Sequence, residues 1–398
     1  MPNYPRLLLV LALIGALAAA QPAGAQGKKK GGEAPSMPPL AQSQMIPMID
    51  THTHLDFTRF TDYGVTLDAM IKTMDDNKVE KTILMPTPMG GIVGQKLYDF
   101  AELLPALQKY PGRVVLMAGP GAFGELYFQK AAAAITDDDR KIFRDKVEAL
   151  AKMPIAGFGE IGIVHLSIPA MGAMHPYESV PADHPLLLLL SDIAAQNNLA
   201  IDIHFDLVPR DMDLPKPLVN PEAKQPNPSR LTQNQDGLER FLAHNRQTKI
   251  IWAHVGSEPL ATRTPAIVRE LLTRNANLYM SFRLQRARPD VAADALTQQG
   301  ALKSDWVRLI SDFSDRFVMG TDTFYQDSPQ ARGGDAVGLE NLQRLLTQLP
   351  PDVARKVGRD NVAQIYRLNA VAQIPLPVDV PTGINPIKGA GKKAKGGT

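Results

Sequence analysis

The chain has 398 residues, of which 44% are hydrophobic and 21% are charged, and it contains no cysteine. This composition is typical of a globular protein with a substantial core and excludes a fibrous or wholly disordered chain. A formal net charge of +2 argues against a protein whose whole surface binds nucleic acid. The lack of cysteine excludes disulfides, thiolate metal sites and thiol nucleophiles, so any metal site must use histidine and carboxylate ligands.

The first 25 residues have the pattern of a signal peptide. An apolar run of 14 residues, 7–20, follows Arg6, and the small residues Ala23-Gly24-Ala25 follow the run. We therefore predict cleavage after Ala25 and a periplasmic or secreted mature protein. The run is too short for a stable membrane-spanning helix, so no membrane span is expected after cleavage. An uncleaved N-terminal anchor is the alternative.

Both ends of the mature chain are rich in glycine and lysine, with GKKKGG at 27–32 and GAGKKAKGGT at 389–398. Such segments cannot bury apolar area, so we predict a disordered linker over 26–44 and a disordered basic tail over 374–398. With Arg6 of the predicted signal peptide included, eight basic residues and one acidic residue lie outside residues 45–386, which leaves that region with a net charge of −5. The overall charge therefore says little about a functional site.

The region 45–373 alternates short apolar runs with helical patterns. Eight runs are predicted to be strands: 45–52, 80–86, 113–118, 155–164, 199–205, 249–254, 277–282 and 316–319. Helical patterns between them include 97–107, 142–150, 186–195 and 267–272. This alternation predicts parallel strands joined by right-handed crossovers, and eight such units fit an α/β (β/α)8 TIM barrel. A doubly wound open sheet is the alternative, although no G-x-G-x-x-G motif follows the first strand.

Two connections are too long for simple loops of a barrel. The segment 163–184 contains three histidines, and the segment 206–232 contains six prolines. Both follow the carboxyl ends of predicted strands, where barrel enzymes build their active sites. We predict that these long loops form pocket walls or lids, with surface decoration as the alternative.

Histidines and carboxylates follow the predicted strands at the spacing of a barrel. His52 and His54 lie in IDTHTHLD at the end of the first strand, where residues i and i+2 point to the same side, so both imidazoles can face one metal. Further candidates lie at or just past the fourth, fifth, sixth and eighth strands: Glu160, His204, His254 and Asp322. We predict that all six side chains meet at one barrel mouth.

This ordered set, H-x-H, Glu, His, His and Asp on strands one, four, five, six and eight, resembles the amidohydrolase superfamily of metal-dependent barrels. The resemblance covers roughly residues 45–371. The segment 356–368, KVGRDNVAQIYRL, resembles the closing helix of the amidohydrolase-related branch, amidohydrolase 2. That branch includes hydrolases, hydratases and decarboxylases, so the resemblance implies a metal-dependent barrel without specifying its substrate.

The resemblance implies roles for the six residues. His254 would bind a second metal or contact the substrate, and Glu160 stands where many members carry a carbamylated lysine that bridges two metals. The implied metal ligands are His52, His54, Glu160, His204, His254 and Asp322. A glutamate at the bridging position favours a two-metal hydrolase over the single-metal decarboxylases, with a position of Glu160 behind the ligands as the alternative.

Imidazole and carboxylate ligands without thiolate suit one or two divalent ions, Zn²⁺ or alternatively Mn²⁺ or Fe²⁺. Asp322 would take the proton of a water activated by the metal and pass it to the leaving group, so Asp322 and His254 are the predicted catalytic residues. Arg283, just past the seventh strand, would bind a substrate carboxylate or phosphate, or else form a structural salt bridge.

We therefore predict an exported hydrolase that acts on an ester, lactone, amide or phosphoester. One alternative is a single-metal decarboxylase or hydratase with a carboxylated substrate, and a second is a non-catalytic metal-binding barrel. The expected partner is a small-molecule substrate, and neither nucleic acid nor a membrane is expected to be a partner. The remaining histidines are predicted not to be ligands: His165, His175, His184 and His244.

Overall fold

A computed structural model describes residues 40–55, 62–88, 98–284, 291–326 and 335–377. All of them belong to one compact unit, Met37–Thr398. The predicted signal peptide, most of the predicted linker and nearly all of the predicted basic tail lie outside the described residues. The last residues of the linker form a 3-10 turn, η1 (Gln42–Gln44).

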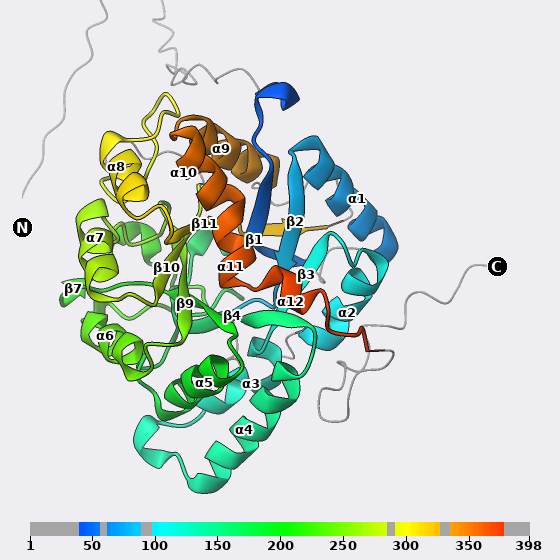
Figure 1. The fold of residues 1–398 in the computed structure, drawn as a ribbon. Coiled ribbons are helices and arrows are strands. Elements are labelled where there is room, and N and C mark those ends of the chain that lie inside the picture. The colour runs from blue at the N-terminus through cyan, green and yellow to red at the C-terminus, as the bar shows by residue number, and fades with distance from the viewer. Residues whose placement is uncertain (1–39, 56–61, 89–97, 285–290, 327–334, 378–398) are drawn as a thin grey trace, which may run out of the picture. The chain divides into compact units, whose positions relative to one another are not determined.

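Eight parallel strands form the centre of the molecule (Figure 1). They are β1 (Met48–Leu55), β2 (Val79–Leu84), β3 (Val114–Ala118), β4 (Ile155–His165), β6 (Ala200–Phe205), β9 (Lys249–Val255), β10 (Leu278–Phe282) and a broken eighth strand made of β11 (Phe317–Met319) and β12 (Thr323–Tyr325). Neighbours in the sheet follow chain order from β1 to β11. Because β11 pairs with β10 and β12 pairs with β1, the eighth strand closes the sheet into the predicted (β/α)8 barrel.

Helices alternate with the strands and cover the barrel. They are α1 (Tyr63–Asp76), α2 (Phe100–Lys109), α3 (Pro120–Phe128), α4 (Asp137–Ala151), α5 (Pro185–Gln196), α6 (Gln235–His244), α7 (Pro265–Arg274), α8 (Ser304–Asp312), α9 (Asp335–Thr347), α10 (Pro351–Arg355), α11 (Asn361–Ile365) and α12 (Leu368–Val371). Among the described residues, no helix combines the length and the apolar character needed to cross a bilayer.

The four helical segments predicted from the sequence are present as α2, α4, α5 and α7, with shifted ends. The largest difference is in α4, which begins five residues earlier than the apolar pattern suggests. Its first turn is acidic and is held by a capping box, in which the Thr136 side chain accepts from Asp139 N. A capping motif, and not apolar periodicity, therefore determines where this helix begins.

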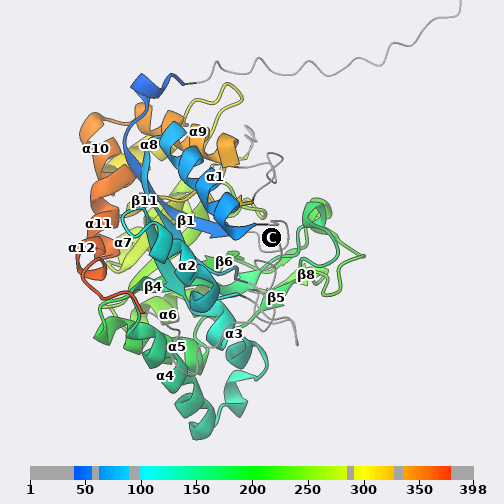
Figure 2. The same cartoon turned by 90° about the vertical axis from the view of Figure 1, so that its right-hand side faces the viewer.

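Two apolar cores stabilise the barrel. The larger lies between strands and helices and contains Trp252 and Phe282. The smaller fills the interior near the strand starts and contains Ile49, Ile251 and Val318. Helices α11 and α12 add further side chains to the smaller core: Val362, Ile365, Leu368 and Val371. Figure 2 shows α10–α12 on the side of the barrel opposite to β5 (Glu178–Ser179) and β8 (Arg230–Leu231), so these helices close the amino end and leave the carboxyl end for polar side chains.

The first and eighth strands differ from the prediction in ways that affect the site. β1 begins and ends three residues later than expected, so His52 and His54 lie inside the strand instead of at its end. The prediction started the strand before Pro47, which has no N–H for a ladder hydrogen bond. The eighth strand resumes at Thr323 after an interruption over 320–322, and this interruption contains Asp322.

Gly320, in that interruption, lies directly against the first strand. A Cβ at this position would overlap Ser281 Oγ and lie 2.7 Å from His52 Cβ. We expect Gly320→Ala to lower the free energy of unfolding by about 1–3 kcal/mol through overpacking, as measured by denaturant unfolding. Gly112→Ala is the control, because a Cβ there has no heavy atom within 4 Å. Equal stability of the two variants would contradict the close packing at Gly320.

The two long connections contain structure of their own. In 163–184, β5 pairs antiparallel with the end of β4, and in 206–232, β7 (Met212–Asp213) pairs antiparallel with β8. The two segments are joined to each other, since Tyr177 N donates to Gln225 O at 2.8 Å. In addition, Asn227 binds both Ser167 N and Ser167 O at 2.8 Å. The long loops thus form a single connected wall beside the barrel.

Candidate metal centre

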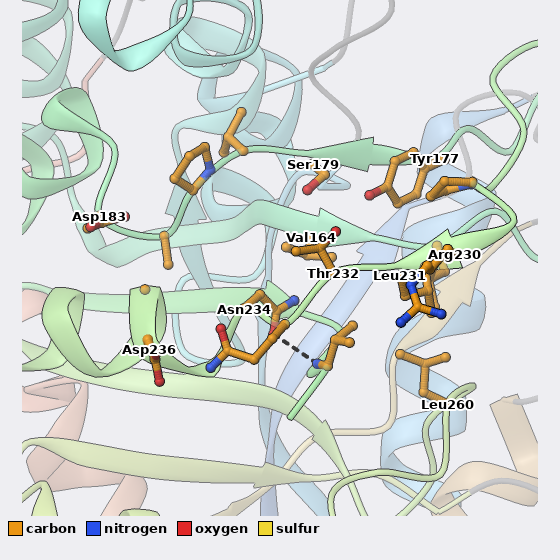
Figure 3. Close-up of a pocket in the computed structure, with 18 of the residues that line it drawn as sticks. Val164, Tyr177, Ser179, Asp183, Arg230, Leu231, Thr232, Asn234, Asp236 and Leu260 are labelled. Carbon is orange, nitrogen blue, oxygen red and sulfur yellow. Dashed lines mark hydrogen bonds between the residues drawn. The ribbon is translucent and has the colours of Figure 1, made fainter. Parts of the chain in front are cut away.

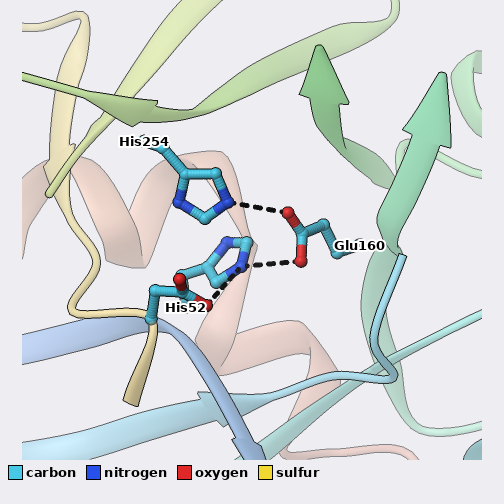
Figure 4. Close-up of side chains that lie close together, drawn as sticks. His52, Glu160 and His254 are labelled. Carbon is cyan, nitrogen blue, oxygen red and sulfur yellow. Dashed lines mark hydrogen bonds and ion pairs between the residues drawn. The ribbon is translucent and has the colours of Figure 1, made fainter. Parts of the chain in front are cut away.

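All six predicted ligands converge in the barrel interior toward its carboxyl end. His52 and His54 come from β1, Glu160 from β4, His204 from β6, His254 from β9 and Asp322 from the interruption of the eighth strand. In Figure 4 the side chains of His52, Glu160 and His254 point toward one another. Ligand atoms of His52, Glu160, His254 and Asp322 all lie within 4.8 Å of one another, a grouping that could hold a metal ion.

Glu160 lies at the centre of the group, and its two oxygens face different histidines. Oε1 is 2.7 Å from His204 Nδ1 and 2.8 Å from His254 Nε2. Oε2 is 3.2 Å from His52 Nε2 and 3.4 Å from His54 Nε2. Glu160 therefore lies between two pairs of histidines, one pair from β1 and the other from β6 and β9. One carboxylate oxygen faces each pair.

Asp322 and Arg283 lie on the more open side of the cluster. Asp322 Oδ1 is 3.3 Å from His54 Nε2, and Asp322 Oδ2 is 3.1 Å from Arg283 Nη1. The side chains of Asp322 and Arg283 are 12% and 15% exposed, whereas that of Glu160 is 2% exposed. Of these three, Asp322 and Arg283 are therefore the side chains better placed to meet an entering molecule.

The protonation and the hydrogen-bond partners of the imidazole nitrogens show whether the cluster suits a metal ion. His54 Nδ1 lies 2.9 Å from Met85 O, and because a carbonyl only accepts, Nδ1 carries the proton and Nε2 keeps its lone pair. Both His52 nitrogens and His54 Nε2 are buried and make no hydrogen bond within the part of the chain that the structure describes. Buried polar atoms normally have such partners, and a divalent cation accepts nitrogen lone pairs. The donor set of imidazoles and carboxylates therefore fits a divalent cation of the Zn²⁺, Mn²⁺ or Fe²⁺ type.

Two of these residues have an unusual backbone conformation. His254 has φ 65° and Asp322 has φ 59°, in the left-handed region that non-glycine residues seldom adopt. Left-handed backbone at a non-glycine residue costs on the order of 1 kcal/mol or more and is retained where the surroundings enforce it. At Asp322 the first strand helps to hold this conformation, because Asp322 N donates to His52 O at 2.8 Å.

Burial and neighbouring charges shift the pKa values of the side chains in the cluster. Burial alone would raise the pKa of the Glu160 carboxyl, but His52, His254 and His204 hold it well below its usual value. Burial would likewise lower the pKa of His52, but the charges of Asp202 and Glu160 raise it well above its usual value. Burial lowers the pKa of His254 to about 3. Glu160 thus remains ionised and attracts positive charge to the centre of the barrel.

Two aspartates that the sequence analysis missed also belong to the site. Asp202 Oδ1 is 3.3 Å from His52 Nδ1, and Asp206 Oδ2 is 3.6 Å from His204 Nε2. Both flank His204 at two residues' distance in IDIHFD, so the alternation used for His52 and His54 also points to them. His165, predicted not to be a ligand, packs beside the site with its ring centroid 4.6 Å from that of His204 and its ring tilted by 59°.

The long loops line a cavity of about 580 Å³ that lies apart from the metal centre (Figure 3). In Figure 3, Asp183 and Asp236 lie at one end, and Tyr177 and Arg230 lie at the other. None of the six predicted ligands lines this cavity. The chemistry therefore points to the His and Glu cluster and not to this cavity.

Comparisons with known proteins found no matching family model and no matching curated protein. Solved structures with a similar fold include a probable 2-pyrone-4,6-dicarboxylic acid hydrolase from Acinetobacter baumannii, at 12% identity and TM-score 0.45, which covers 81% of this chain and 100% of its own. A 2,6-dihydroxybenzoate decarboxylase from Rhizobium, at 13% identity and TM-score 0.45, covers 82% and 100%.

A third structure is an amidohydrolase 2 from Bifidobacterium longum subsp. infantis, at 10% identity and TM-score 0.41, which covers 81% of this chain and 98% of its own. The three neighbours are thus described as a probable hydrolase, a decarboxylase and an amidohydrolase.

Proposed function

We propose that this protein is a metal-dependent hydrolase with two divalent ions, acting on an ester, lactone, amide or phosphoester. The arrangement of Glu160 carries the proposal, because one carboxylate oxygen faces His52 and His54 and the other faces His204 and His254. A carboxylate so placed suits a bridging ligand between two ions, each also held by two imidazoles. Asp322 would complete the His52 and His54 side.

A bound divalent ion would supply Lewis-acid chemistry, making a water nucleophilic at neutral pH and polarising the scissile carbonyl or phosphoryl group. Asp322 is the proposed proton carrier, since Arg283 and His254 outweigh its burial and lower the pKa of its carboxyl. Asp322 is thus ionised and can accept the proton of the attacking water through one carboxylate oxygen and then donate it to the leaving group. His254 would hold an ion or contact the substrate on the opposite side of Glu160.

Arg283 is proposed to bind an anionic group of the substrate. Its Nη1 contacts Asp322, whereas its Nε is buried and makes no hydrogen bond to any described residue. A substrate carboxylate or phosphate is an acceptor that a guanidinium prefers. The same contact with Asp322 means that Arg283 also fixes the carboxylate, so the two roles predicted from the sequence are compatible.

The decisive experiment counts metal ions in active protein and then removes them. We expect close to two ions of Zn²⁺, Mn²⁺ or Fe²⁺ per chain by elemental analysis, loss of hydrolysis after chelation, and recovery when the ion is added back. Matched esters and lactones with and without a carboxylate, assayed with wild type and Arg283→Gln, test the anionic subsite. The carboxylated series should lose more activity in the variant.

Other outcomes would change the proposal. Active protein with well under one ion per chain would overturn it. One ion per chain together with CO₂ release from an aromatic or unsaturated carboxylic acid would favour the single-metal decarboxylase. A full complement of ions without turnover of any substrate in the panel would favour the non-catalytic metal-binding barrel.

We also propose that the protein is exported, on the basis of the apolar run at 7–20 and the small residues before position 26. Cell fractionation and sequencing of the mature N-terminus test this proposal. A mature chain that begins at Gln26 outside the cytoplasm is expected, and a cytoplasmic chain that begins at the initiator methionine would contradict export.

A further inference from the structure

We infer that Asp202 of β6 and Asp206, which follows the last residue of β6, are positioning residues, each of which fixes the tautomer and orientation of a different metal-facing histidine. The inference rests on the proposed metal site. Asp202 and His204 lie in β6 and Asp206 directly follows it, so the three residues stand at alternate positions, which point to the same side of a strand. The two aspartates nevertheless contact different histidines, one from β1 and one from β6.

Asp202 contacts the imidazole of His52. Its side chain is fully buried, and among the described residues neither carboxylate oxygen makes a hydrogen bond of standard geometry, while Oδ1 lies 3.3 Å from His52 Nδ1. A Cβ at Gly159 would lie 2.8 Å from Asp202 Cβ, so a glycine makes room for this aspartate. Burial of a carboxylate lowers the stability of the fold unless a partner compensates for the lost hydration. Packing alone therefore does not explain an aspartate at this position.

The contact with Asp202 favours one tautomer of His52. A carboxylate only accepts, so Asp202 favours the form of His52 with the proton on Nδ1. The lone pair then lies on Nε2, which is the nitrogen that faces Glu160 at 3.2 Å. A metal-binding histidine commonly gives its second N–H to a carboxylate in this way, which fixes the ring and increases the basicity of the ligating nitrogen.

Asp206 contacts the His204 ring at the nitrogen that does not face Glu160. Its Oδ2 accepts from Leu166 N at 2.9 Å, which ties it to the end of β4, and lies 3.6 Å from His204 Nε2. The other nitrogen, His204 Nδ1, faces Glu160 at 2.7 Å. Asp206 thus favours the His204 form whose Nδ1 is free to bind an ion, on the side of Glu160 away from His52.

Because the two histidines lie on opposite sides of Glu160, the two aspartates should control two different ions. We expect Asp202→Asn and Asp206→Asn each to weaken one of the two Zn²⁺ sites by about 10- to 100-fold and to leave the other close to wild type. An amide is neutral and can donate to the imidazole, which permits the wrong tautomer. Zn²⁺ binding is measured by competition with a chromophoric chelator, independently of any activity.

A double-mutant cycle shows whether each aspartate acts through its histidine. Asp202→Asn should weaken Zn²⁺ binding in wild type but have no further effect in a His52→Ala background, and Asp206→Asn should behave likewise in His204→Ala. Equal effects in both backgrounds would overturn the inference, because the aspartates would then act on general stability. Circular dichroism confirms folding, and if Asp202→Asn does not fold, the Asp206 cycle decides the inference.

Asp192→Asn is the matched control. Asp192 also contacts a histidine, with Oδ2 3.1 Å from His244 Nε2, but on the exposed surface. It should bind Zn²⁺ as wild type does. If wild type binds Zn²⁺ and both site variants bind it equally tightly, the positioning roles are wrong and the proposed function stands. If wild type takes up no divalent ion, the proposed function fails and the inference fails with it.

Discussion

Glu160→Gln is expected to lose Zn²⁺ affinity by at least about 100-fold, more than the roughly 10- to 100-fold typical of residues behind the ligands. The change keeps the size of the side chain but removes the charge that four imidazoles share. One oxygen of the carboxylate becomes an –NH₂ group, which offers no lone pair to an ion. Both ion positions should therefore weaken together, and hydrolysis should disappear at stoichiometric Zn²⁺.

Glu102→Gln is the matched control for this experiment. Glu102 is also a buried glutamate, and its Oε2 accepts from Asp99 N at 2.9 Å in the cap of α2. It belongs to the helical layer and not to the barrel interior, so the control should bind Zn²⁺ with wild-type affinity. A Glu160→Gln protein with two tightly bound ions would show that Glu160 lies behind the ligands, and the two-metal proposal would lose its main support.

Asp322→Asn is expected to lower kcat by about 10²- to 10⁴-fold with a smaller change in KM, which is the range for loss of a general base or acid. The amide cannot carry a proton between water and leaving group. Asparagine and aspartate both tolerate the left-handed backbone better than most residues, so the φ of 59° at this position should persist in the variant. The loss would then report on the proton carrier and not on a rearranged strand.

Two measurements separate proton transfer from loss of the ion. In Asp322→Ala, added formate should restore part of kcat, whereas added Zn²⁺ alone should not. Asp312→Asn is the control, since Asp312 forms an Asp–Arg ion pair with Arg269 at 2.6 Å on the surface. An Asp322→Asn enzyme with full kcat would contradict the assigned role.

Sequence patterns were sufficient for the barrel and for which residues meet inside it. Eight apolar runs gave eight strands, because a strand buried on both faces appears as a short continuous apolar segment. The six candidates converged because parallel strands present their carboxyl ends at the same end of the barrel. The roles of those residues as ligands stay predictions.

Other features depend on the folded barrel and have no local pattern. The central position of Glu160 follows from the juxtaposition of β1, β4, β6 and β9, which are far apart in sequence. The interruption at 320–322 and the pairing of Arg283 with Asp322 are likewise tertiary. Asp202 and Asp206 are different, because the alternation of a strand around His204 points to both of them from the sequence alone.

The broken eighth strand sets the order in which the protein must fold. The first strand can pair with its last neighbour only after the chain has been made through residue 325, and Asp50 and Thr321, 271 residues apart, form hydrogen bonds at 2.6 and 3.0 Å across this seam. Closure of such a distant pair is slow compared with formation of local βα units. The candidate metal centre draws on both sides of the seam, so a partly synthesised or partly refolded chain would hold at most a subset of the proposed ligands. Full metal uptake by this centre would therefore be a late event in the maturation of the protein.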